Sequence, residues 1–208
     1  MGHYNNATIC LNGHVVSKYQ ANYQKFCSKC GKETYSKCPE CNSPIHGKYE
    51  VEDQIDAAKV IGKYNYVDAS RIGIFGWSYG GFMSSNCLFQ GADVFKMAIA
   101  VAPVTSWRYY DSIYTERYMQ TPQENASGYD NNSPINQVSK LKGNFLLVHG
   151  TADDNVHVQN TMKMVEALVQ ANKQFDWAIY PDKNHGIYGG KTRLQLYTKM
   201  TNFIKEKL

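Results

Sequence analysis

The sequence predicts a protein of the α/β class, in which a parallel sheet lies between helices, preceded by a small cysteine-rich domain. From residue 51 onward, short runs of β-branched and aromatic residues alternate with longer patterns of helical period. Polar side chains follow directly after three of these runs, where open parallel sheets place their sites. The first 50 residues instead hold five of the six cysteines and no long apolar run. We therefore divide the chain into residues 1–50 and 51–208.

The composition is that of an ordinary globular protein, with 43% hydrophobic and 19% charged residues and a net charge of +4. Residues 1–50 carry six lysines and three glutamates, and residues 51–208 carry sixteen basic and fifteen acidic residues. This weak basic balance does not favour a nucleic-acid partner. The chain has no apolar run of about 18 residues and no signal peptide at its start, so we expect no membrane association and a cytoplasmic location.

Two Cys-x-x-Cys pairs lie in the first domain: Cys27, Cys30, Cys38 and Cys41. Without an export signal, this spacing indicates a metal rather than disulfides. Four thiolates make a closed tetrahedral shell, which is typical of structural zinc. Cys10 and His14 could form a further pair, or could be a buried cysteine and a surface histidine. The segment resembles small uncharacterised bacterial zinc-ribbon proteins, and this resemblance implies a structural zinc ion but no activity.

The second domain is expected to begin with a helix and a strand. Ile55, Ala58 and Ile61 recur at helical spacing, and Ile72–Phe75 is typical of a buried strand. The next residues, Gly76-Trp-Ser-Tyr-Gly80, match the G-x-S-x-G nucleophile elbow. In that motif the serine occupies a strained turn, and we expect both glycines to be needed for close backbone approach. The alternative is a glycine-flanked turn without a chemical role.

A helix from about Tyr79 to Phe89 should follow the serine. Its first N–H groups lack partners within the helix, so the backbone N–H of Tyr79 is a candidate oxyanion donor. The remaining expected elements are a strand at 97–101, helices at 109–119 and 133–141, a strand at 145–148, a helix at 156–171, a strand at 175–180 and a helix from 191. Four strands alternating with helices imply a parallel sheet with right-handed crossovers.

A candidate acid and a candidate base follow the last two predicted strands. One strand leads into Asp153 and Asp154, and the other leads into His185. The chain order of serine, acid and histidine is the order found in α/β-hydrolases. The sequence therefore predicts a catalytic triad of Ser78 and His185 with one of these two aspartates.

Six stretches of the second domain are distinctive: 51–55 (VEDQI), 76–81 (GWSYGG), 102–104 (APV), 109–118 (YYDSIYTERY), 149–156 (HGTADDNV) and 185–186 (HG). On these stretches, residues from about Val51 to the C-terminus resemble the end of the catalytic domain of the dipeptidyl peptidase IV group in the prolyl oligopeptidase family. The resemblance implies a truncated α/β-hydrolase fold and a serine peptidase without a catalytic cofactor. Its substrate would be a peptide with Pro or Ala at the second position.

The resemblance also implies individual roles. Ser78 would be the nucleophile, His185 the general base, and Asp153 rather than Asp154 the orienting acid. Asn155 would donate a hydrogen bond to a substrate carbonyl. Five residues would wall a small pocket for proline or alanine: Val104, Trp107, Tyr110, Tyr114 and Val156. Core packing is the alternative for the aromatic residues.

Three further residues, His149, His157 and Cys87, are expected to be structural. The family's catalytic domain begins with additional strands and a second oxyanion donor, and its members also have a propeller; we find no match to these parts here. The alternative function is therefore a zinc-ribbon module that binds protein or nucleic acid and carries an inactive hydrolase fragment. Because family members associate through the end of this domain, a homodimer is also expected.

Overall fold

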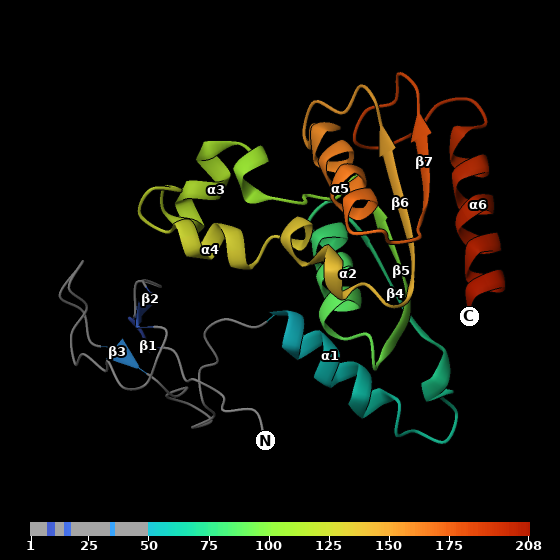
Figure 1. Ribbon diagram of the computed structural model, residues 1–208, viewed down its shortest axis with the longest axis horizontal. Helices are drawn as coiled ribbons and strands as arrows, with labels where there is room; N and C mark the ends of the chain where they lie inside the picture. The colour runs from blue at the N-terminus through green and yellow to red at the C-terminus, as the bar shows by residue number, and fades with distance from the viewer. Residues whose placement is uncertain (1–7, 11–14, 18–33, 36–49) are drawn as a thin grey trace. The chain divides into compact units, whose positions relative to one another are not determined.

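The computed structural model describes residues 8–10, 15–17, 34–35 and 50–208 (Figure 1). The chain divides into two compact units, Met1–Glu50 and Val51–Leu208. In the first unit, three short strands form an antiparallel sheet in the order β2-β1-β3: β1 (Thr8–Cys10), β2 (Val15–Ser17) and β3 (Thr34–Tyr35). Cys10 is thus the last residue of β1. The other predicted zinc ligands, Cys27, Cys30, Cys38, Cys41 and His14, lie outside the described residues.

Four parallel strands form the sheet of the second unit, in the order β4-β5-β6-β7. They are β4 (Ile72–Trp77), β5 (Phe95–Val101), β6 (Asn144–Gly150) and β7 (Asp176–Tyr180). All four predicted strands and their parallel arrangement are confirmed. The strands in the middle of the sheet, β5 and β6, are the most apolar, because both of their faces are buried.

Helices cover both faces of this sheet (Figure 1). On one face lie α1 (Glu50–Ile61), α2 (Tyr79–Gln90) and α5 (Gln159–Gln170), and on the other lies α6 (Thr192–Lys207). Successive residues of a strand point to opposite faces, so in β5 Ala98 packs toward α2 while Ile99 packs toward α6. Leu196, Met200 and Phe203 give α6 its buried stripe.

The segment between β5 and β6 differs most from expectation. The predicted helix 109–119 is a 3-10 turn, η3 (Trp107–Tyr109), followed by α3 (Ser112–Met119). The two are separated because the side chain of Asp111 accepts a hydrogen bond from the N–H of Tyr114, at 2.8 Å, and so starts a new helix. The predicted helix 133–141 is a 3-10 helix, η4 (Pro134–Lys140). The short helix α4 (Ala126–Asn131) was not predicted.

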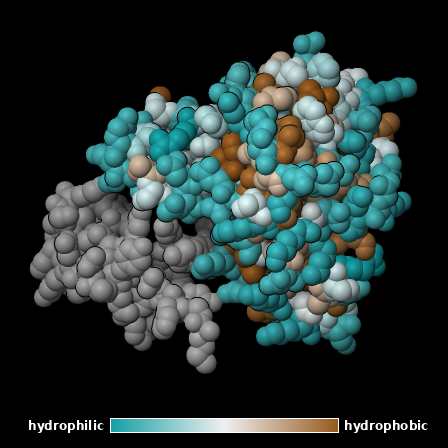
Figure 2. Space-filling model, in the orientation of Figure 1, coloured by the Kyte–Doolittle hydropathy of each residue, from teal (hydrophilic) through white to brown (hydrophobic). Residues whose placement is uncertain are grey.

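One edge of the sheet leaves apolar groups exposed. Strand β4 has a neighbour on one side only, and half of the surface of Phe75 is exposed. Figure 2 shows that hydrophobic residues also reach the viewed surface of the second unit among a majority of hydrophilic ones. Within the described residues, no helix is long and apolar enough to cross a membrane.

Candidate active site

Ser78 lies in a strained turn between β4 and α2. Its backbone angles are φ 61° and ψ −119°, a conformation that residues other than glycine rarely adopt. The turn is fixed on both sides, because the N–H of Ser78 donates to the carbonyl of Val101 at 2.8 Å and its carbonyl accepts from the N–H of Phe82 at 3.1 Å. The structure therefore holds the serine outside both regular elements and partly exposed, as the elbow motif predicts.

The glycines around this turn are not equivalent. A Cβ atom at Gly76 would overlap the carbonyl group of Gly80, so no other residue fits there. A Cβ atom at Gly80 would meet nothing within 4 Å. The expectation that both motif glycines are needed for space is therefore wrong for Gly80. Gly81 is the second crowded position, because a Cβ atom there would lie 2.8 Å from that of Pro103.

Asp153 and His185 form a hydrogen-bonded pair, with 2.8 Å between Oδ2 of the aspartate and Nδ1 of the histidine. The other carboxylate oxygen accepts from the backbone N–H groups of Asn155 and Val156, at 3.0 and 2.9 Å. Burial by itself would raise the pKa of Asp153, but hydrogen bonds with His149 and His185 outweigh burial and hold that pKa well below its usual range. The ionised carboxylate fixes the proton on Nδ1 of His185 and leaves Nε2 free to accept another.

The structure distinguishes the two candidate acids. Asp153 is buried with 3% of its surface exposed, whereas Asp154 is exposed and lies outside the pair. A hydrogen bond also connects the histidine loop to the end of β4, because the indole N–H of Trp77 donates to the carbonyl of His185 at 2.9 Å. Among the hydrogen bonds of residues 50–208, none joins Ser78 to His185. Such bonds are often long in the absence of substrate.

The candidate oxyanion donor, Tyr79, is the first residue of α2, so its N–H has no acceptor within the helix. Tyr79 is 40% exposed, and its ring packs against two others, 5.8 Å from that of Phe82 and 5.9 Å from that of Trp107. These contacts fix the residue that follows the serine. They also connect the serine turn to the predicted pocket wall.

The predicted wall residues are brought together around Trp107. Its ring lies 5.8 Å from that of Tyr110 and 5.9 Å from that of Tyr114. Val104, Trp107 and Val156 belong to one buried cluster with 0–7% of their surfaces exposed, whereas Tyr114 is 43% exposed. The two valines and the tryptophan are thus core residues, while the tyrosines present a partly open aromatic surface.

Asn155 is held by a contact that the sequence did not reveal. The hydroxyl of Tyr110 donates to Oδ1 of Asn155 at 2.7 Å, across 45 residues of sequence. Burial, followed by the charges of Asp111, Tyr114 and Asp153, raises the pKa of Tyr110, so its hydroxyl keeps its proton. With Oδ1 occupied, the amide of Asn155 has its Nδ2 donors available for a ligand.

The three residues expected to be structural differ in their burial and in their contacts. Cys87 is fully buried, and burial raises its pKa to about 12, so it is an unreactive core thiol as predicted. His157 is exposed, and its Nδ1 accepts from the N–H of Gln159 at 3.3 Å. His149 is buried, and its Nε2 lies 3.2 Å from Oδ2 of Asp153. This last contact was not predicted, because a spacing of four residues indicates a contact within a helix and His149 lies at the end of a strand.

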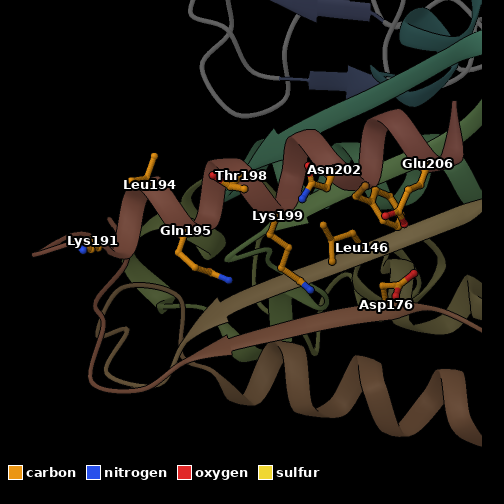
Figure 3. Close-up of a pocket in the computed structure, with 10 residues that line it drawn as sticks. Leu146, Asp176, Lys191, Leu194, Gln195, Thr198, Lys199, Asn202 and Glu206 are labelled. Atoms are coloured by element: carbon orange, nitrogen blue, oxygen red, sulfur yellow. The ribbon is translucent and has the colours of Figure 1, made fainter.

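A groove of about 610 Å³ lies between α6 and strands β6 and β7. Figure 3 shows Gln195 and Lys199 pointing from the helix toward these strands. The residues that line it are Leu146, Asp176, Lys191, Leu194, Gln195, Thr198, Lys199, Asn202, Phe203 and Glu206. None of them is a predicted site residue, so the groove is separate from the candidate active site.

Comparison with known proteins supports this picture of the second unit. The sequence profile of the Prolyl oligopeptidase family matches residues 42–208, beginning directly after the last cysteine of the predicted zinc site. Dipeptidyl peptidase 4 of Felis catus is 49% identical over 163 residues, which cover 77% of this chain and 21% of that protein. The chain spans about a fifth of the length of the curated relatives that it matches.

A solved structure gives the same result. The crystal structure of Porphyromonas gingivalis dipeptidyl peptidase 4 is 59% identical and superimposes with a TM-score of 0.75, over 77% of this chain and 23% of that chain. The second unit thus has an α/β-hydrolase-like fold with a parallel sheet and flanking helices, as the sequence predicts.

Proposed function

Because the chain belongs to the prolyl oligopeptidase family, we propose that residues 51–208 are the catalytic part of a serine peptidase of the dipeptidyl peptidase IV type. One observation carries this proposal: Asp153 and His185, 2.8 Å apart, follow β6 and β7 of the same parallel sheet whose strand β4 ends just before the strained Ser78. The relatives named dipeptidyl peptidase 4 support the choice of reaction. The proposed substrate is a peptide with Pro or Ala at its second position.

The proposed reaction uses the three residues in the usual order. The Oγ atom of Ser78 attacks the carbonyl carbon of the scissile bond, and Nε2 of His185 takes the hydroxyl proton. The backbone N–H of Tyr79 donates to the oxyanion that forms. His185 then gives its proton to the leaving amine, which yields an acyl-enzyme. Water, deprotonated by the same histidine, hydrolyses this ester and restores the serine.

The aromatic surface around Trp107 suits the proposed substrate. A proline ring is flat and apolar and has no N–H to satisfy, so it can lie against Tyr110 and Tyr114 without cost to hydrogen bonding. Asn155 would donate from Nδ2 to a substrate carbonyl while Tyr110 holds its Oδ1. Tyr110 would then have two roles, because its ring would form part of the pocket wall and its hydroxyl would hold Asn155.

A fluorophosphonate probe tests whether Ser78 is an activated nucleophile. We expect stoichiometric labelling of the folded chain at Ser78, and no labelling of Ser78→Ala or of the heat-unfolded chain, because activation requires the assembled site. Mass spectrometry of the labelled peptide identifies the residue. Equal labelling of Ser78→Ala, or no labelling of a chain that unfolds cooperatively, would contradict the proposal.

We also propose that Cys27, Cys30, Cys38 and Cys41 bind one structural zinc ion, on the strength of their paired spacing. Metal analysis of the purified chain should then find one zinc ion per chain. The double variant Cys27→Ser, Cys38→Ser should lose it, whereas Cys87→Ser should keep it because Cys87 lies in the core of the other unit. Zinc retained by the double variant would disprove this ligand set.

A further inference from the structure

His149 is a buried titratable side chain that the reaction above does not use. It lies in β6, none of its surface is exposed, and both ring nitrogens have partners. Nδ1 is 2.6 Å from Oγ1 of Thr161 in α5, and Nε2 is 2.8 Å from the carbonyl oxygen of Val156. Because a carbonyl can only accept, Nε2 carries a proton, and in the neutral ring Nδ1 then accepts from the threonine hydroxyl.

The same Nε2–H group, which donates to the carbonyl of Val156, has a second and longer contact with the triad. It lies 3.2 Å from Oδ2 of Asp153, the oxygen that also accepts from His185 at 2.8 Å. The carboxylate therefore has four N–H neighbours, two on each oxygen: the backbone N–H groups of Asn155 and Val156, His149 and His185. Three of these four are fixed parts of the fold, and only His185 belongs to the reacting groups.

We propose that His149 is a positioning residue, whose Nε2–H is shared between the carbonyl of Val156 and Oδ2 of Asp153 and holds that carboxylate oxygen in the orientation in which it accepts from His185. The hydrogen bond of Thr161 to Nδ1 keeps the proton of His149 on the side of the aspartate. A chain of contacts thus runs from α5 through His149 to the triad. The contact between His149 and Asp153 does not depend on the proposed peptidase function, whereas its effect on catalysis rests on that function.

A neutral donor suits this position better than a cation. During the reaction His185 becomes an imidazolium, and a second positive charge on the same carboxylate oxygen would oppose it. With its proton on Nε2 and its Nδ1 accepting, His149 contributes a hydrogen bond without a charge. Tyr110 also keeps its proton, because burial, and to a smaller extent the charges of Asp111, Tyr114 and Asp153, raise its pKa.

Two substitutions separate the hydrogen bond from the bulk of the ring. His149→Leu fills a similar volume without a donor, whereas His149→Gln can place an N–H near the position of Nε2. We expect His149→Leu to slow fluorophosphonate labelling of Ser78 about tenfold, as for loss of one buried hydrogen bond. Glutamine should restore most of that rate. Equal impairment by leucine and glutamine would overturn the proposal, because the ring rather than its N–H would then matter.

A second measurement does not depend on activity. The proton between Nδ1 of His185 and Asp153 should give a downfield proton NMR resonance in the wild-type chain and in His149→Gln. In His149→Leu the looser carboxylate should broaden this resonance through exchange with water. A resonance unchanged in a folded His149→Leu chain would overturn the proposal. Because this signal needs no turnover, it tests the contact even if Ser78 is never labelled.

Thr161→Val covers the case in which His149→Leu does not fold. Valine keeps the shape of threonine but removes the hydroxyl that Nδ1 accepts from, so the proton of His149 can move away from Asp153. We expect slower labelling and a broader resonance, each to a smaller extent than predicted for leucine. If Thr161→Val leaves both the labelling rate and the resonance unchanged, the proposal is wrong.

Discussion

The two halves of the candidate site are held in place by different forces. The Asp153–His185 pair lies in loops after β6 and β7 and is fixed by hydrogen bonds to a buried carboxylate. The aromatic wall lies between β5 and β6, in short helices, and is fixed by ring packing around Trp107. Loss of a polar contact should therefore impair the chemistry with little unfolding, and loss of a ring should unfold the wall.

The largest expected effect tests the polar half. Asp153→Asn should lower the rate of Ser78 labelling by roughly 10³–10⁴, because an asparagine favours the wrong tautomer of the histidine it contacts. Asp154→Asn is the matched control, since it changes a neighbouring exposed carboxylate. Labelling kinetics of both variants give the comparison. Equal rates in the two variants would remove Asp153 from the proposed triad.

The next effect tests the aromatic half. Trp107→Ala should lower the free energy of unfolding by about 3–5 kcal/mol, because the side chain is 93% buried among four rings. Trp177→Ala should cost much less, since 46% of that residue is exposed. Urea unfolding of the two variants measures the difference. If both variants lost a similar free energy of unfolding, the packing of the aromatic wall would not depend on Trp107.

A smaller effect links the polar half to pH. The pKa of Asp153 is lower in the folded chain than its usual value, so its ionised form stabilises the fold above the pKa of the unfolded chain. This stabilisation is lost as the pH falls below about 4 and toward the folded-state pKa. We therefore expect the Tm of the wild-type chain to fall more steeply with acid than that of Asp153→Asn. If the Tm of the two chains fell equally with pH, the lowered pKa of Asp153 would be contradicted.

The smallest effect concerns the contact between the two halves. Tyr110→Phe removes the hydroxyl that holds Oδ1 of Asn155, so KM for a glycyl-prolyl anilide should rise about three- to tenfold. Labelling by a small fluorophosphonate should not change, because the amide contacts the peptide rather than the nucleophile. Tyr109→Phe serves as the control. An unchanged KM in Tyr110→Phe would argue against Asn155 as a substrate contact.

Sequence patterns predicted the parts of the fold that burial dictates. Residues 97–101 of β5 are a continuous apolar run because both faces of that strand are covered, and α6 shows a regular stripe that includes Leu196. Helix α4 was missed because it has only six residues, includes Gly128 and lacks an apolar period. The break before α3 depends on the Asp111 cap, which a pattern of aromatic residues hides.

Within the candidate site, local motifs predicted residue types but not their partners. The G-x-S-x-G pattern located the strained serine, yet the free space at Gly80 depends on how α2 leaves the turn. The contact between Tyr110 and Asn155 joins segments 45 residues apart, so no local pattern could reveal it. The same holds for Thr161, whose contact with His149 exists only because α5 packs against β6.

The hydrogen bond from Trp77 to the main chain of His185 gives the molecule an internal optical reporter. If the loop that carries the base swings outward, the indole loses its acceptor and meets water, and its fluorescence emission moves to longer wavelength. Replacing the half-exposed Trp177 by phenylalanine would leave only the buried Trp107 as a second indole, whose emission should stay at shorter wavelength. Stopped-flow mixing with substrate could then time the motion of the base directly.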